Sequence, residues 1–320
     1  MEAFRKLYPG EYQARYQRRG VRPDGRACDE VRHTRIVCGV LRGPVGSALV
    51  RRGRTAVIAS ASPRLALAAS SESSGNTYQA MDSSSDDTPT STAAPTILAL
   101  NVELLPVCGP SHRPGRPSAQ AQSLCRRLHS VLSSSALPSE LLPTVRILSS
   151  AEQDAEQADP ACCPPLQWRF CVDVYALEDA GGLFDACLLA AVSALQQLRL
   201  PALCLASSSE EAQNAPVLTM PTVHPFALCE PLSLRADRLP ASLSFGVLDG
   251  QLLADPTHHE DELLSASLHV VLAGDGQLLL TLQPGGEPIS PVLLATAIKQ
   301  ARQHCEHLFS MLDQQATTAS

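Results

Sequence analysis

The feature that most restricts the fold is a repeated order of short apolar runs, glycine turns and an amphipathic helix. In the N-terminal half, two apolar runs flank Arg51-Arg52-Gly53-Arg54, a short glycine-containing loop typical of a β-hairpin. In the C-terminal half, two further runs flank Asp249-Gly250, the strongest short-range hairpin signal. Strands followed by helices in two successive blocks favour an α+β fold over a doubly wound α/β fold.

Three segments repeat apolar residues at helical spacing. The first carries an apolar stripe at 121–132, and the second occupies 183–198. The third opens with Ser290-Pro291, a candidate N-cap followed by proline at the first helical position. Residues 168–177 are apolar on nearly both faces, as in a central strand. The pattern therefore predicts sheets covered by helices.

Composition divides the chain into two domains and several connecting or terminal segments. A stretch rich in Ser, Thr and Asp indicates a flexible insertion, and a polar, turn-rich stretch indicates a linker. The predicted division is a basic N-terminal extension at 1–30, a first domain at 31–205 with the Ser-rich insertion at 70–95, a linker at 206–222, a second domain at 223–312 and a tail at 313–320. We expect the tail to fray.

The formal net charge of −7 conceals an asymmetry along the chain. Residues 1–60 hold 13 Lys and Arg against 5 Asp and Glu, a balance of +8, and the remaining residues hold 12 against 27, or −15. A basic block of this kind can attract phosphates or an acidic partner subunit, or it can be an ordinary solvated face. The sequence leaves these alternatives open.

The eleven cysteines mostly stand singly inside apolar runs, where free cysteine packs as a small hydrophobic residue. None of them forms a C-x-x-C pair. Residues 1–17 are charged from the start, which argues against a signal peptide, and no apolar stretch reaches the ~20 residues of a membrane span. We therefore expect a reduced intracellular compartment and no membrane contact.

Several motifs, in a fixed order, resemble those of the RNase PH family. They are Arg22-Pro23-Asp24-Gly25-Arg26, Gly46-Ser47-Ala48-Leu49-Val50 with Gly53-Arg54-Thr55-Ala56-Val57-Ile58, Asp173-Val174-Tyr175 with Gly181-Gly182 and Asp185-Ala186-Cys187, and Phe245-Gly246-Val247 with Asp255-Pro256-Thr257 and Glu260-Asp261. The resemblance covers about residues 20 to 310 and implies an RNase PH-like fold of two layered sheet-and-helix domains. Within the family, Pro106–Gln122 and Thr222-Val223-His224-Pro225 most resemble a non-catalytic ring subunit of the eukaryotic RNA exosome.

The resemblance also implies where catalytic groups would stand. Active members use inorganic phosphate to cleave RNA from its 3′ end, and their Gly-Gly turn is followed by hydroxyl and arginine residues that bind the phosphate. Here Leu183, Phe184 and Asp185 follow the turn. The first two offer no donor, and we expect the carboxylate to favour the helix dipole and repel phosphate. Ser267 stands where active members keep an Asp for proton transfer or metal binding, and serine fills neither role. We therefore predict that catalysis is lost.

The acidic loop of the second domain does not decide activity. Asp255, Glu260 and Asp261 are present, but catalytic and silent members of the family share this loop. The neighbouring His258-His259 could be drawn as metal ligands, but adjacent side chains diverge and a solvated loop is the better interpretation. We expect neither a metal nor a cofactor.

The resemblance further implies the partners. They are other RNase PH-like subunits in a hetero-hexameric ring, cap subunits with RNA-binding domains, associated nucleases and single-stranded RNA, in the nucleus, including the nucleolus, and in the cytoplasm. Arg113, Arg116 and Arg126 lie in or after a Pro/Gly-rich loop that the family points toward the ring channel, which makes them candidate RNA contacts. Alternatively, they are surface arginines or bind the neighbouring subunit. Three functions remain: a ring scaffold, an active phosphorolytic exoribonuclease and a free-standing RNA-binding module.

Overall fold

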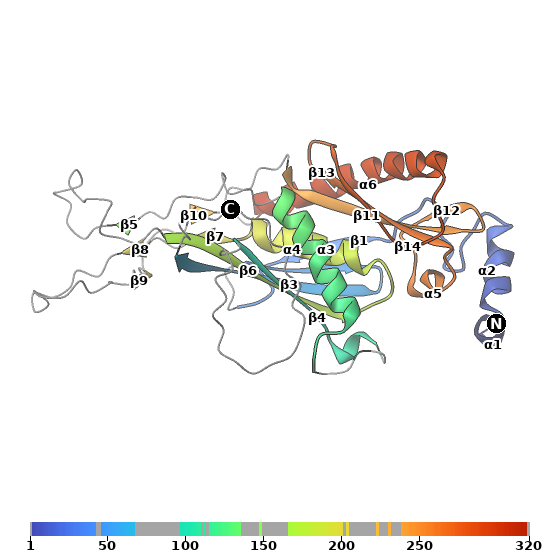
Figure 1. Ribbon diagram of the computed structural model, residues 1–320, viewed down its shortest axis with the longest axis horizontal. Helices are drawn as coiled ribbons and strands as arrows, with labels where there is room; N and C mark the ends of the chain where they lie inside the picture. Colours follow the sequence, from blue (N-terminus) through green and yellow to red (C-terminus); the bar gives the residue numbers. More distant parts are fainter. Residues whose placement is uncertain are drawn as a thin grey trace, which may run out of the picture.

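The computed structural model describes residues 2–42, 46–67, 97–109, 112, 115–135, 147–148, 166–200, 203–204, 222–223, 230–231 and 238–318. The predicted Ser-rich insertion at 70–95 and nearly all of the predicted linker at 206–222 lie outside these residues. The two domains are therefore described through their ordered sheets and helices (Figure 1).

The first sheet has five strands in the order β1-β2-β3-β6-β4. Their bounds are β1 Thr34–Cys38, β2 Gly46–Arg52, β3 Thr55–Leu67, β4 Leu98–Leu104 and β6 Leu166–Glu178. Neighbours are antiparallel except β4 and β6, which are parallel. The predicted hairpin is confirmed, but its turn is shorter than expected. Arg51 and Arg52 belong to β2, and only Gly53, at φ +58°, and Arg54 turn the chain.

The second sheet has four antiparallel strands in the order β12-β11-β13-β14. Their bounds are β11 Pro240–Leu248, β12 Gln251–Ala254, β13 Ala266–Ala273 and β14 Leu278–Gly286. The predicted Asp249-Gly250 turn is confirmed. Both residues have positive φ, +49° and +76°, as a two-residue hairpin requires.

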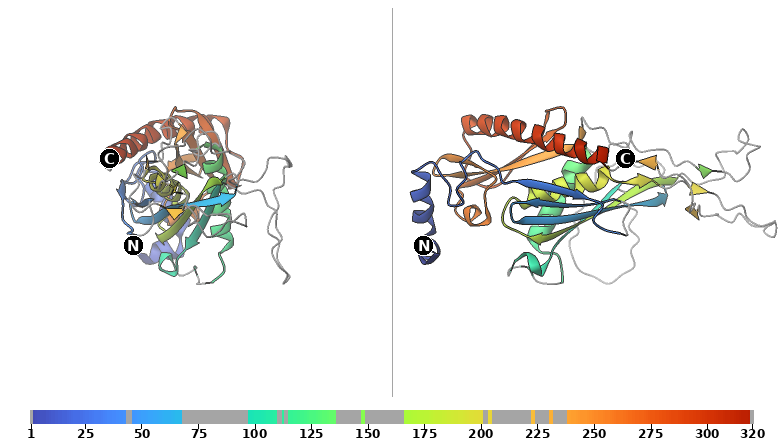
Figure 2. Two further views of the ribbon diagram at one scale, coloured as in Figure 1. Left: turned by 90° about the vertical axis from the view of Figure 1, so that its left-hand side faces the viewer. Right: turned by 180° about the vertical axis from the view of Figure 1, so that it is seen from behind.

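Three long helices and the two sheets form alternating layers (Figures 1 and 2). Their bounds are α3 Ala119–Ser135, α4 Leu183–Gln196 and α6 Pro291–Thr318. α3 and α4 lie between the sheets, and α6 covers the other face of the second sheet (Figure 2). Every residue of α4 from Leu183 to Leu195 is buried, because this helix has a sheet on either side. This arrangement confirms the predicted α+β fold.

The C-terminal prediction needs a correction. We expected 313–320 to fray, but α6 continues to Thr318. Leu312, the last buried residue of its apolar face, is followed by a stretch without Gly or Pro, so nothing stops the helix at that point. Within the described residues, no helix is long and apolar enough to span a membrane.

The remaining elements are short. They are α1 Glu2–Leu7, α2 Pro9–Gln17, a 3-10 turn at Pro106–Cys108, α5 His258–Asp261, and the strands β5 Ile147–Leu148, β7 Arg199–Leu200, β8 Leu203–Cys204, β9 Thr222–Val223 and β10 Glu230–Pro231. β8 pairs with β5 and β9, and β7 with β10.

The core is mainly aliphatic, and small residues set its spacing. Ala48, Ala59 and Ala61 are fully buried on the strands that face α4. At Gly46 the helix comes so close that an added Cβ would overlap the carbonyl oxygen of Ala194. This tight contact fixes α4, and therefore fixes the turn that precedes it.

Candidate active site

The candidate site surrounds the Gly181-Gly182 turn at the start of α4. Both glycines have positive φ, +98° and +63°, a backbone conformation that side chains disfavour. A Cβ at Gly181 would lie 2.5 Å from the carbonyl oxygen of Pro256 and 2.6 Å from the backbone nitrogen of His258. The loop after β12 thus packs directly on the turn, and the site lies where the two domains meet.

Thr55, at the start of β3, holds this turn in place. Its buried hydroxyl donates to the carbonyl oxygen of Gly181 at 2.7 Å and accepts from the backbone N–H of Ala180 at 3.1 Å. The threonine of the family-like hairpin motif therefore positions the Gly181-Gly182 turn.

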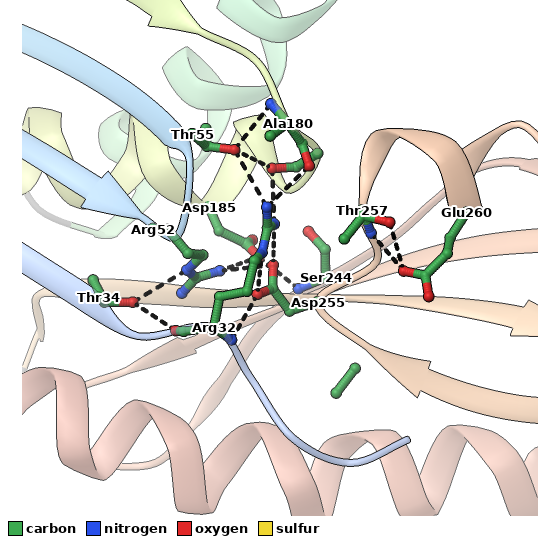
Figure 3. Close-up of polar contacts among 12 residues, drawn as sticks. Arg32, Thr34, Arg52, Thr55, Ala180, Asp185, Ser244, Asp255, Thr257 and Glu260 are labelled. Carbon is green, nitrogen blue, oxygen red and sulfur yellow. Dashed lines mark hydrogen bonds and ion pairs between the residues drawn. The ribbon is translucent and has the colours of Figure 1, made fainter. Parts of the chain in front are cut away.

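Arg32 links the turn to the second domain (Figure 3). Its guanidinium donates from Nε and Nη2 to the two carboxylate oxygens of Asp255, at 2.8 and 2.6 Å. The same guanidinium donates to the carbonyl oxygens of Ala180 and Gly181, both at 2.9 Å, and to Thr55 Oγ1 at 3.4 Å. These contacts use all five of its N–H groups.

Asp255 is buried beside the turn as a carboxylate. Burial alone would raise its pKa, but the hydrogen bonds from Arg32 and the charges of Arg52 and Arg32 hold the pKa well below its usual range. A Cβ at Gly182 would lie 2.8 Å from Asp255 Oδ1, so this carboxylate stands at the N-terminal end of α4. A negative charge there is favoured by the helix dipole.

Asp185 behaves differently from our expectation. Its side chain is 1% exposed and turned into the core, where it accepts from Ser242 Oγ and the Ser244 backbone N–H, both at 2.7 Å. Arg52, also buried, donates to it at 2.8 Å. The predicted repulsion of phosphate by Asp185 is therefore wrong, because the charge is neutralised inside the protein.

Leu183 and Phe184 are both buried. The ring of Phe184 lies 4.9 Å from that of His269, centroid to centroid, and the N-cap residue Gly182 makes no side-chain cap. Neither side chain supplies a donor to the first turn of α4. The observed geometry agrees with the sequence in this respect.

Ser267 lies inside β13, in register with Gly246 and Gly285. β13 begins one residue before it, at Ala266. Two residues along the same face, His269 Nδ1 lies 2.6 Å from Ser244 Oγ. The equivalence of Ser267 to a catalytic Asp stays a prediction.

The acidic loop binds the N-terminal segment. Glu260 is buried and forms a capping box with Thr257 at the start of α5. Arg22, which is 0% exposed, donates to both carboxylate oxygens of Glu260, and Gln13 donates to one at 3.1 Å. Burial would raise the pKa of Glu260, but Arg22 and Thr257 lower it overall. Asp261 is exposed.

The structure shows where several arginines of the basic block at residues 1–60 lie. Arg22, Arg26, Arg32 and Arg52 point inward and meet backbone carbonyls or carboxylates of the second domain and of α4. These arginines join distant parts of the chain inside the protein. The sequence had suggested only a surface for phosphates or an acidic partner, or a solvated face. Sequence reasoning missed them, although the position of Arg22 and Arg26 inside a family-like motif was a usable signal.

The candidate RNA contacts are only partly described. Arg113 lies outside the described residues, and Arg116 and Arg126 are exposed. RNA binding by these arginines stays a prediction. His258 and His259 are exposed, with their rings 6.2 Å apart, and the described part of the chain holds no group of three or more His, Cys, Asp or Glu arranged for a metal ion.

Comparison with known proteins supplies the family context. Residues 30–201 match the model of the 3′ exoribonuclease family, domain 1, and residues 238–304 match domain 2 of that family. The chain is 27% identical over 299 residues to the exosome complex component rrp43 of Schizosaccharomyces pombe, covering 93% of each chain. It is 24% identical over 297 residues to the exosome complex component Rrp42 of Methanothermobacter thermautotrophicus, covering 92% of this chain and 91% of the relative.

Solved structures share the fold. One is described as the Archaeoglobus fulgidus exosome with RNA bound to the active site, with a TM-score of 0.65 and 23% identity over 94% of this chain and 96% of that chain. Another is an archaeal exosome core, with a TM-score of 0.62 and 21% identity over 95% of both chains.

Proposed function

The chain belongs to the 3′ exoribonuclease family, and we propose that it serves as a non-catalytic ring subunit of an RNA exosome. Similarity over more than nine-tenths of two proteins named exosome complex components supports the ring assignment. The contacts of Arg32 and Asp255 at the α4 turn support the lack of catalysis. The two arguments are independent.

The proposed lack of catalysis rests on Arg32, whose N–H groups are all hydrogen-bonded within the protein. Phosphorolysis requires a place for inorganic phosphate, and a helix N-terminus is a natural one. Here all five N–H groups of the nearest guanidinium already have acceptors, and the Asp255 carboxylate stands next to Gly182. The charge of Asp255 is balanced by Arg32, whose N–H groups are all paired. A phosphate at this turn would have to break that ion pair before Arg32 could bind it.

The proposal includes the assembly and the compartments that membership of the family implies. The subunit would stand among other RNase PH-like subunits in a hetero-hexameric ring, with cap subunits that carry RNA-binding domains, and would help form a channel for single-stranded RNA. Associated nucleases would then cleave the RNA in 3′-to-5′ processing and degradation, including rRNA maturation and mRNA turnover. Such a complex would work in the nucleus, the nucleolus and the cytoplasm.

An assay of phosphorolysis tests the proposal against its alternative, an active phosphorolytic exoribonuclease. The purified full chain is incubated with single-stranded RNA and inorganic phosphate, beside an active member of the family, and nucleoside diphosphates are measured. We expect release only from the active member. Phosphate-dependent release by this chain, abolished in an Asp261→Asn variant that melts like the wild type, would overturn the non-catalytic assignment.

The ring assignment needs a separate readout. Native mass measurement of the complex recovered with this chain is expected to show other RNase PH-like proteins. Recovery of the chain alone, with RNA binding intact, would favour a free-standing RNA-binding module instead.

A further inference from the structure

The N-terminal arm, residues 2–20, projects from one end of the molecule. It consists of α1, α2 and the turn that follows them, and it stands beyond β12 and α5 (Figures 1 and 2). Gln13 and Gln17 are the buried residues of α2. Gln13 donates to Glu260 at 3.1 Å, so this side of α2 is attached to the second domain. The other side of the helix faces away from it.

Aromatic side chains form a continuous group on this outward side of the arm. Tyr8, Tyr12 and Tyr16 recur every four residues and therefore share one helix face. The ring centroids of Tyr12 and Tyr16 lie 5.0 Å apart. The ring of Phe4, in α1, lies 6.0 Å from that of Tyr8 and 6.3 Å from that of Tyr12. Tyr8 is 56% exposed, so its ring is accessible to a ligand.

Three exposed arginines lie at the C-terminal end of α2. Arg18 and Arg19 follow Arg15 by three and four residues, which makes the three side chains neighbours on the helix surface. No carboxylate among the described residues lies within 4.0 Å of their guanidinium groups. Arg15 stacks on Phe4, with its guanidinium carbon 4.5 Å from the ring centroid. The arginines therefore adjoin the aromatic group and carry positive charge that these residues do not neutralise.

Single-stranded RNA is the ligand that matches both groups of side chains. Its bases stack on aromatic rings, and its phosphates pair with guanidinium forks whatever the base sequence. Residues 2–20 hold 5 Lys and Arg against 2 Asp and Glu, so the charge of the arm is also opposite to that of RNA. An acidic protein segment would match the arginines alone, whereas RNA matches the arginines and the exposed ring.

We propose that the N-terminal arm binds single-stranded RNA, with a base stacked on Tyr8 and phosphates held by the three arginines of α2. α5 joins the arm to the α4 turn. Its Glu260 accepts from Gln13, and the backbone N–H of His258 donates to the carbonyl oxygen of Ala180 at 3.1 Å. The arm thereby holds RNA at the end of the molecule that carries the α4 turn. This site goes beyond the proposed ring function, because it requires neither phosphorolysis nor neighbouring subunits.

Equilibrium binding of a short fluorescein-labelled oligouridylate to the full chain tests the proposal. Arg18→Gln with Arg19→Gln removes two of the cations, and its matched control is Arg35→Gln with Arg51→Gln, an exposed arginine pair on β1 and β2. Tyr8→Leu removes the exposed ring, and its matched control is Tyr8→Phe, which keeps a ring. Melting temperatures establish that each variant is folded.

We expect the Arg18/Arg19 variant to weaken binding about tenfold. The slope of log affinity against log salt concentration should flatten by about 0.7 for each phosphate that the pair no longer neutralises. Tyr8→Leu should weaken binding at least about fivefold at an unchanged salt slope, because it removes a stacked base without removing charge. Tyr8→Phe should bind like the wild type.

Wild-type affinity in the Arg18/Arg19 variant, or an equal weakening in the Arg35/Arg51 control, would overturn the proposal. So would equal affinities of Tyr8→Leu and Tyr8→Phe. A wild-type chain that does not bind the oligouridylate, with a protein lost from the native complex of the Arg18/Arg19 variant, would overturn it in favour of a protein contact. Failure of the ring assignment is distinguishable, since it would appear in the native mass of the wild-type complex and leave these binding curves unchanged.

Discussion

Replacing Arg52 by methionine tests the buried ion pair that joins the first sheet to α4. The two side chains are completely buried, and the Arg52 Nη1–Asp185 Oδ2 distance is 2.8 Å. The substitution leaves the Asp185 carboxylate in the core with two neutral donors, Ser242 Oγ and the Ser244 N–H. Removing one partner of a buried pair typically costs about 3–5 kcal/mol, because an uncompensated charge remains.

Urea and thermal unfolding measure this cost. At roughly 2–4 °C per kcal/mol, Arg52→Met should lower the melting temperature by about 10 °C. Arg51→Met is the matched control, since its side chain leaves the same strand toward solvent and should change stability by less than about 0.5 kcal/mol. The double variant Arg52→Met with Asp185→Asn should recover part of the stability, because the amide removes the buried charge.

If Arg52→Met lowers the free energy of unfolding no more than Arg51→Met does, the Arg52–Asp185 pair does not stabilise the fold. The same conclusion follows if the unfolding free energies lost in Arg52→Met and in Asp185→Asn simply add up in the double variant. Strict additivity would mean that the two side chains do not stabilise each other.

Further predictions concern packing and pH. Gly46→Val should destabilise the protein by more than about 2 kcal/mol in urea unfolding, whereas Gly10→Val, where no atom lies within 4 Å of an added Cβ, should not. The pKa values of Asp255 and Glu260 are lowered on folding, so the stability they contribute is complete above a pH of about 4 and is lost as the pH drops further. Asp255→Asn should make this loss of stability at acid pH less steep. The pKa of His304 is lowered from 6.5 to about 4, so stability should also fall between these two pH values as the unfolded chain gains the proton first. His304→Gln should remove this second loss of stability, since glutamine does not titrate, while keeping an acceptor for Arg52.

The local elements were predictable because they depend on short-range patterns. The Asp249-Gly250 turn, the helix at α4 and the Ser290-Pro291 start of α6 follow from neighbouring residues alone. The end of α6 was missed for a related reason. We took the last apolar residue as the end of the helix, although no Gly or Pro follows before Thr318.

The buried arginine–carboxylate pairs were not predictable, because they join residues far apart in the sequence. Arg22 and Glu260 are separated by 238 residues, and no spacing rule indicates which arginine meets which carboxylate. Asp185 shows the same limit. Its place in the first turn of α4 suggested a role at the helix end, but the second sheet brings Ser242 and Ser244 to it and turns the carboxylate inward. The long-range contact decides its role.

We propose that Arg32 and Asp255 close the α4 turn to inorganic phosphate. Calorimetric titration of the full chain with inorganic phosphate measures whether this turn binds the anion, with Arg32→Met as the comparison variant. We predict no saturable binding to the wild-type chain. Saturable binding to the wild-type chain that disappears in Arg32→Met would mean that the turn still holds a phosphate.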